Sequence, residues 1–211
     1  MKKIISFSLY GSDTKYTIGA ICNAEIAKII FPDWICRYYC GESVPNEILD
    51  KLKSFSNVEV INMKEDTTYS YMMWRFLPID DNDTEVMLCR DIDSRLSYRE
   101  KSCVDLFLES NKLLHSIQDH QLHDNMMGGM WGIKKNNRIN MKTLAENWKG
   151  GMDYFSDQLF IREIIKPIFI DTYLVHCSSY LHNFPVEKTD NYFVGEIFSD
   201  NRGKPYDYIF F

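Results

Sequence analysis

Two aspartates separated by one residue are the residues of this chain best suited to chemistry. Asp91 and Asp93 follow the apolar run 86–89 and Arg90. An unbroken apolar run of this length is typical of a strand buried on both faces of a parallel sheet. Ligands of such sheets bind beyond the carboxyl ends of the strands, so both carboxylates are expected at a ligand site. Carboxylates combined with substrate phosphates suit Mg²⁺ or Mn²⁺, which leads us to expect an enzyme acting on a nucleotide diphosphate.

Spacing alone does not establish this site. The chain has 30 acidic residues in 211, and a second Asp-x-Asp triplet, at residues 81–83, lies in a polar stretch typical of a surface loop. The position after a buried strand, between Arg90 and Arg95, distinguishes Asp91 and Asp93 from that triplet. The two arginines fit either a phosphate site or simple neutralisation of the aspartates.

Composition limits the possible classes of protein. Hydrophobic residues make up 45% of the chain and aromatic residues 14%, enough for one substantial domain or at most two small ones. The net charge is −6 without a dense basic block, which argues against a nucleic-acid partner. We expect no transmembrane segment, because no run of 18 apolar residues occurs. Six scattered cysteines without a C-x-x-C pair are typical of buried, reduced thiols and argue against zinc.

The first half of the chain alternates between strand and helix patterns. Strands are expected at 3–9, 34–39, 58–63 and 85–89, and helices at 16–31, 45–55 and 71–77. Pro78 is expected to end the third helix. This β-α-β-α-β-α-β order predicts an α/β fold with a mainly parallel central sheet flanked by helices on both faces.

The second half is less regular. Strands are expected at 112–118, 126–133 and 173–175, with a further candidate at 192–196, and helices at 97 to about 110, 141–148 and 156–165. Pro167 is expected to end the last helix. We interpret residues 1–211 as a single domain, with a nucleotide-binding half at about 1–95 and an acceptor half at about 96–211. The apolar end at 208–211 fits packing on the domain or a piece of a larger multidomain chain.

Several short motifs occur in an order that a known family shares. They are Phe7–Gly11, Trp74–Phe76, Arg90–Arg95, His120 followed by Gly128–Gly132, and Asp157–Gln158. Together they resemble metal-dependent nucleotide-sugar glycosyltransferases of the GT-A (Rossmann-like) fold. They are similar to small glycosyltransferase domains of chlorella-type large viruses and bacterial capsule clusters. The similarity covers most of residues 3–180. It implies transfer from a nucleotide-sugar donor, UDP-linked, to a glycan hydroxyl. The short apolar stretch after Lys3 is no signal peptide, and we expect a cytoplasmic protein, in the host cytoplasm if the protein is viral.

The resemblance also implies roles for particular residues. Asp91 and Asp93 would hold Mn²⁺ or Mg²⁺, with Asp91 nearer the ribose of the donor. His176, after the expected strand at 173–175, would complete the metal site; a hydrogen-bonded structural histidine is the alternative. Tyr10 and Gly11 would meet the base and ribose, since glycine permits close backbone approach and the aromatic ring can stack on a pyrimidine. An ordinary glycine turn is the alternative there.

Further candidates lie on three other segments. Arg75 suits a phosphate or ribose, or else a salt bridge on the helix surface. Gly129 would bring the backbone close to the donor sugar with Trp131 as a flat apolar face; a tight bend beside a core tryptophan fits equally. Asp157 is the candidate general base if transfer inverts the anomeric centre, the outcome we favour. If configuration is retained, Asp157 and Gln158 would lie beneath the donor sugar, and a simple helix-end role remains open.

Two other functions compete with this interpretation. Phosphatases of the haloacid-dehalogenase type use Asp-x-Asp, but on the first strand and with Thr or Val two residues on, whereas here the pair follows the fourth expected strand. A non-catalytic nucleotide-sugar or carbohydrate-binding module of GT-A fold is the stronger alternative, because a fold persists where activity is lost.

Overall fold

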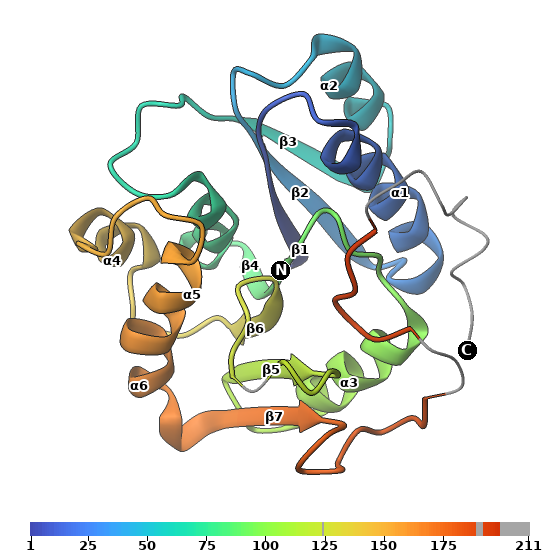
Figure 1. The fold of residues 1–211 in the computed structure, drawn as a ribbon, viewed down its shortest axis with the longest axis vertical. Helices are drawn as coiled ribbons and strands as arrows, with labels where there is room; N and C mark the ends of the chain where they lie inside the picture. Colours follow the sequence, from blue (N-terminus) through green and yellow to red (C-terminus); the bar gives the residue numbers. More distant parts are fainter. Residues whose placement is uncertain (124, 189–191, 199–211) are drawn as a thin grey trace.

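Seven strands form one sheet in the order β3-β2-β1-β4-β6-β5-β7 (Figure 1). The computed structural model describes residues 1–123, 125–188 and 192–198, so the apolar end at 208–211 lies outside the described residues. The strands are β1 (Lys2–Leu9), β2 (Trp34–Cys40), β3 (Val58–Asn62), β4 (Thr84–Arg90), β5 (Leu114–Gln118), β6 (Met130–Lys134) and β7 (Tyr173–Cys177). β6 runs antiparallel to β4 and β5, and the other neighbouring pairs are parallel. The predicted α/β fold with a mainly parallel sheet is confirmed.

Helices cover both faces of this sheet. They are α1 (Thr14–Ile30), α2 (Asn46–Lys53), η1 (3₁₀, Tyr71–Asp80), α3 (Tyr98–Glu109), α4 (Met141–Asn147), α5 (Ser156–Phe160), η2 (π, Ile161–Ile165), α6 (Lys166–Ile168) and η3 (3₁₀, Ile170–Thr172). Successive strand residues face opposite sides, so Val86 and Leu88 of β4 pack in one core with α1, α2 and α3. Met87 and Cys89 pack in a second core with η1, α4 and α5. This two-sided burial explains the continuous apolar run of β4.

Two helix ends that we predicted from prolines are wrong. η1 continues to Asp80 with Pro78 inside it, instead of ending at Leu77. The predicted helix at 156–165 is α-helical only to Phe160, and a π-helical turn then leads into α6, which contains Pro167. Proline fixes φ near the helical value and removes one N–H donor, so short 3₁₀ and π turns accommodate it where a long α-helix does not.

Two predicted strand segments are also not strands. Residues 126–129 form a loop, and β6 begins only at Met130. The candidate strand at 192–196 is a turn, because the Val194 N–H donates to the Asp119 carboxylate at 3.0 Å and Gly195 has φ +90°. A side-chain acceptor and a positive φ both take the backbone out of the extended conformation.

All six cysteines are buried thiols, as expected. Within the part of the chain that the structure describes, each helix is too short or too polar to span a bilayer.

A buried ion pair joins the end of β4 to α3. Arg90 is 1% exposed, and its Nε donates to Glu100 Oε1 at 2.5 Å. Its Nη1 donates to the carbonyls of Cys89 and Trp131 at 2.7 and 2.9 Å. Burial raises the pKa of Glu100, and the charge of Arg90 opposes that rise. Arg90 therefore fixes the strand end that precedes Asp91, and it does so through Glu100 instead of by pairing with the neighbouring aspartates.

We expect Arg90→Met to lower the free energy of unfolding by about 3 to 5 kcal/mol, because it leaves the Glu100 carboxylate buried without its partner. The double variant Arg90→Met/Glu100→Leu should recover much of that loss, since no buried charge remains. Urea denaturation followed by circular dichroism measures both variants. A single variant as stable as the wild type would contradict this account of the pair.

Candidate functional site

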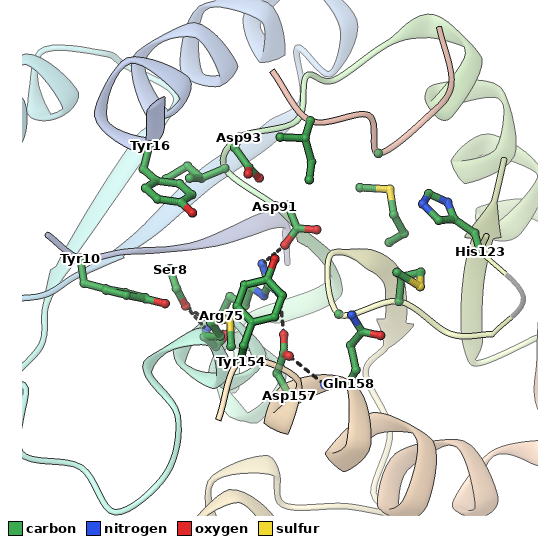
Figure 2. A pocket seen from close by; sticks show the side chains of 17 residues that line it. Ser8, Tyr10, Tyr16, Arg75, Asp91, Asp93, His123, Tyr154, Asp157 and Gln158 are labelled. Atoms are coloured by element: carbon green, nitrogen blue, oxygen red, sulfur yellow. Dashed lines mark hydrogen bonds and ion pairs between the residues drawn. The ribbon is translucent and has the colours of Figure 1, made fainter. Parts of the chain in front are cut away.

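A pocket of about 290 Å³ opens at the carboxyl edge of the sheet, beside the ends of β1 and β4 (Figure 2). Its wall combines the end of β1, the first turn of α1, η1, the loop after β4, the loop before β6 and the start of α5. Five predicted site residues line it together: Tyr10, Arg75, Asp91, Asp93 and Asp157. The parallel strands thus gather side chains that lie up to 147 positions apart, as expected for ligand sites at this edge.

Arg75 bridges two of these carboxylates. Its Nη1 lies 2.6 Å from Asp91 Oδ1, and its Nη2 lies 2.8 Å from Asp157 Oδ2. Nη1 also donates to the carbonyl of Arg90 at 3.1 Å, and the Arg75 backbone N–H donates to Ser8 Oγ at 3.1 Å. Arg75 is 5% exposed. Its guanidinium therefore joins the end of β4 to the start of α5 from inside the protein, and its backbone N–H adds the link to β1. The salt bridge to Asp157 is buried, whereas the Asp91 partner is partly exposed, so these are not the helix-surface pairs considered from the sequence.

Two glycines give the carboxylates room. A Cβ on Gly129 would lie 2.1 Å from Asp91 Cγ, and one on Gly128 would lie 2.4 Å from Asp157 Oδ2. Trp131 is fully buried, and its Nε1 donates to the Gly128 carbonyl at 3.1 Å. The glycine-rich segment is therefore a tight bend beside a core tryptophan, and Trp131 offers no face to a sugar in the pocket.

Asp157 is a buried carboxylate with fixed partners. It lies at the start of α5, as predicted, and is 3% exposed. Besides the Arg75 pair, its Oδ1 accepts the N–H of Gln158 at 2.8 Å. Burial raises the pKa of Asp157, Arg75 opposes that rise and the charge of Asp91 adds to it. A carboxylate with a raised pKa is a stronger base than an ordinary aspartate.

Asp93 has a cationic partner from another element. Lys15 Nζ, on the first turn of α1, lies 2.7 Å from Asp93 Oδ2. Burial alone would lower the pKa of Lys15, but the hydrogen bond and charge of Asp93 outweigh it and raise that pKa. Figure 2 shows Asp91 and Asp93 at the same side of the pocket. The side chain of Asp91 is 41% exposed, so it has room for a further ligand.

The chemistry of this pair fits a hard divalent cation held with a substrate. Mg²⁺ is commonly bound through one or two carboxylates plus substrate phosphates, without a full cage of protein ligands. Asp91 and Asp93 supply such carboxylates and line the same pocket. Within the described residues, no cluster of three or more His, Cys, Asp or Glu side chains is arranged to hold a metal. The residues present therefore suit a cation whose remaining ligands come from phosphate and water.

The loop that carries both aspartates is anchored to α1. The Asn23 side-chain amide donates to the carbonyls of Ile92 and Ser94 at 3.2 and 2.9 Å, and its oxygen accepts the N–H of Leu96 at 3.2 Å. A Cβ on Gly19 would lie 2.2 Å from the Ile92 carbonyl oxygen. Helix α1 and this loop are thus in close contact, and their relative position is fixed by buried hydrogen bonds.

Three predicted site residues lie outside the pocket lining. His176, on β7, is 4% exposed, and its Nδ1 is 2.8 Å from Nε2 of His115 on the neighbouring strand. Burial lowers the pKa of both histidines, which keeps this pair neutral. Gly11 has φ +73°, and its N–H donates to Ser43 Oγ at 2.7 Å. Gly129 contacts the pocket indirectly, through Asp91. The structure does not bring His176 together with Asp91 and Asp93.

Tyr10 forms part of an aromatic group at the pocket. It is 38% exposed and meets the rings of Tyr71 and Trp74 edge to face, at centroid distances of 5.6 and 6.3 Å. This packing holds the exposed tyrosine ring in place, which suits a surface for a planar ligand.

Other lining residues were missed by sequence reasoning. Tyr16 and Tyr154 reach the pocket from α1 and from the loop before α5, and Gly195 and Ile197 reach it from the last described segment. Lys15 was also missed. Aspartate is favoured at helix starts, so Asp13 was a sequence signal for the start of α1. In the structure its side chain accepts the Lys15 N–H at 2.8 Å, and the first turn of the helix lies at the pocket. No local pattern marks Tyr154 or the residues at 195 and 197.

The fold of this chain is similar to that of several solved transferase structures. No protein-family model and no curated protein sequence matches the chain. Among solved structures, Staphylococcus aureus TarS matches with a TM-score of 0.59 and 11% identity over 85% of this chain. The galactosyltransferase LgtC, in complex with donor and acceptor sugar analogues, matches with a TM-score of 0.53 and 14% identity over 83% of this chain and 73% of LgtC.

A different kind of transferase matches as well. The 4-diphosphocytidyl-2C-methyl-D-erythritol synthase of Anaerococcus prevotii has a TM-score of 0.54 and 13% identity over 90% of this chain and 92% of the synthase. The chain spans 59% of the TarS structure, less than two thirds of its length. At these identities the likeness shows the fold alone, which is the one shared by GT-A glycosyltransferases and cytidylyltransferases.

The raised pKa of Asp157 predicts a pH dependence of stability. The folded protein holds this proton more tightly than the unfolded chain, in which aspartate titrates at about 3.9. We expect the free energy of unfolding of the wild type, relative to Asp157→Asn, to fall as pH rises from about 3.9 through the raised pKa. Urea denaturation of both proteins over this range measures the difference. A difference that grows with pH would mean that attraction by Arg75 outweighs burial.

Proposed function

We propose that this protein is a metal-dependent glycosyltransferase that moves a sugar from a nucleotide-sugar donor, UDP-linked, to a glycan hydroxyl. The observation that carries the proposal is the shared pocket of Asp91, Asp93 and Asp157 at the carboxyl edge of an α/β sheet. It is supported by the fold of TarS, one structure of which is a complex with UDP, and of LgtC with its sugar analogues.

In this proposal Asp91 and Asp93 hold Mn²⁺ or Mg²⁺ together with the donor diphosphate. The chemistry supplied by such a cation is neutralisation of the charge that develops on the departing nucleoside diphosphate. Arg75 keeps Asp91 in place through its 2.6 Å contact, and Tyr10 offers its exposed ring to the base. His176 is left out of the cation site, because its Nδ1 is already paired with His115 inside the sheet.

Asp157 is the proposed general base for an inverting transfer. Its raised pKa favours acceptance of the proton from an acceptor hydroxyl, and each carboxylate oxygen keeps a second lone pair beside its present partner. Arg75 and the Gln158 N–H fix the orientation of the carboxylate before substrate arrives. Should transfer retain configuration, Asp157 and Gln158 would instead lie beneath the donor sugar. NMR of the anomeric linkage in donor and product distinguishes the two outcomes.

Replacement of Asp93 tests the metal-dependent step. We expect Asp93→Ala to reduce Mn²⁺-dependent turnover of the donor by about 100-fold or more. The variant loses a direct ligand of the cation that holds the diphosphate. Release of UDP from a UDP-sugar in the presence of Mn²⁺ is the measurement. The matched control is Asp83→Ala, which removes the same charge from the exposed second triplet, where Asp83 pairs with Lys2. Near wild-type turnover by Asp93→Ala would refute the proposed role.

A cytidylyltransferase is the second candidate, because a cytidylyltransferase of Leptospira borgpetersenii shares this fold over 76% of its length and the Anaerococcus synthase over 92%. A non-catalytic nucleotide-sugar or carbohydrate-binding module of the same fold is the third. These functions differ in the nucleotide that binds and in whether it is consumed.

A panel of nucleotides with Mn²⁺ separates these candidates. A ligand at one hundred times its Kd should raise the Tm by about 5 to 10 °C for a chain of this size. We expect UDP and one UDP-sugar to raise the Tm and that UDP-sugar to be consumed. Stabilisation by CTP in place of UDP favours the cytidylyltransferase. Tight binding of a UDP-sugar without consumption, even with candidate acceptors, favours the module.

A further inference from the structure

Lys15 pairs with Asp93, which lines the pocket. Its Nζ lies 2.7 Å from Asp93 Oδ2, and the two side chains are 25% and 12% exposed. Nζ also lies 4.7 Å from the ring centroid of Tyr16, which lines the pocket. A charge-assisted contact of this length in a partly buried place is stronger than an ordinary surface pair.

Both partners of this contact are held by the fold. Lys15 belongs to the first turn of α1, where Asp13 caps the helix. Asn23 of the same helix binds the loop at Ile92 and Ser94, and the Phe198 N–H donates to the carbonyl of Asp93 at 2.9 Å. The helix and the loop therefore keep their separation, and the flexible part of the contact is the four-carbon side chain of Lys15.

An ammonium group and a divalent cation compete for one carboxylate oxygen. A cation bound at Asp93 Oδ2 has to displace Lys15 Nζ or lie beside it, and two positive groups in contact repel each other. A nucleoside diphosphate changes this balance, because its phosphate oxygens give the displaced ammonium a new partner.

We propose that Lys15 is a resident counter-ion of Asp93 that yields to the divalent cation and then pairs with the donor diphosphate. This inference rests on the proposed function. Lys15 weakens cation binding to the nucleotide-free protein and strengthens nucleotide binding once the cation is present. Cation and diphosphate therefore bind cooperatively, and by linkage each raises the affinity of the other by the same factor.

Titration of Mn²⁺ by calorimetry, with and without UDP, tests this role in the full chain. We expect Lys15→Met to bind Mn²⁺ about three- to tenfold more tightly than the wild type in the absence of UDP, since the competing pair is gone. With Mn²⁺ present, the same variant should bind UDP about tenfold more weakly. The cooperativity factor between Mn²⁺ and UDP should fall accordingly.

Two variants serve as controls. Lys28→Met makes the same charge change in the last turn of α1, where Nζ lies over the ring of Phe55; it should match the wild type in both titrations. Lys15→Arg keeps the positive charge and should retain most of the cooperativity. Circular dichroism and the Tm of each variant establish that the fold is intact.

The outcomes separate this inference from the proposed function. If Asp93→Asn abolishes Mn²⁺ binding while Lys15→Met leaves both affinities at wild-type values, the counter-ion role is overturned and the cation site stands. If the wild type binds no Mn²⁺ either with or without UDP, the cation site and the role of Lys15 are overturned together.

Discussion

The contact of the buried Arg75 side chain with Asp91 and Asp157 is the constraint on which the rest of the site depends. Two carboxylates from segments 66 positions apart are brought into one pocket, and the guanidinium between them offsets their repulsion. Its planar fork fits both partners at once, a geometry that lysine does not offer. The cost of burying the guanidinium is met by these two charges and by the Arg90 carbonyl. Removal of either carboxylate would leave a buried positive charge less well paired.

The backbone around this contact is shaped to allow it. Gly128 and Gly129 pass so close to Asp157 and Asp91 that a side chain at either position would displace a carboxylate. The sequence fitted either a backbone close to a donor sugar or a tight bend beside a core tryptophan, and the structure shows that both glycines lie against the acidic groups of the site. Trp131 then closes the bend from the core side through the Gly128 carbonyl. The absence of side chains at these two positions therefore gives the site's own carboxylates the room they occupy.

The sequence predicted the parts of this site that depend on local patterns, and it missed the contacts between residues far apart in the chain. The apolar run of β4 is a local signal, and it placed Asp91 and Asp93 correctly at a strand end. Proline signals misled at Pro78 and Pro167, because 3₁₀ and π turns accept a residue that an α-helix excludes. The partners of Arg75 lie 16 and 82 positions away, and no local pattern encodes such a pairing. The same holds for Lys15 with Asp93.

The direction of β6 determines which loops border the pocket. Since β6 runs opposite to β4 and β5, the described residues of the connection between β5 and β6, 119–123 and 125–129, lie at the carboxyl edge of the sheet. The connection that leaves β6, at 135–140, lies at the opposite edge, where the Lys135 N–H donates to the Glu85 carbonyl at the start of β4. Changes of length or composition in the first connection can thus reshape what the pocket admits, whereas the second can vary independently of it. The antiparallel direction of β6 thus separates a connection that can change the specificity of the pocket from one that only supports the fold.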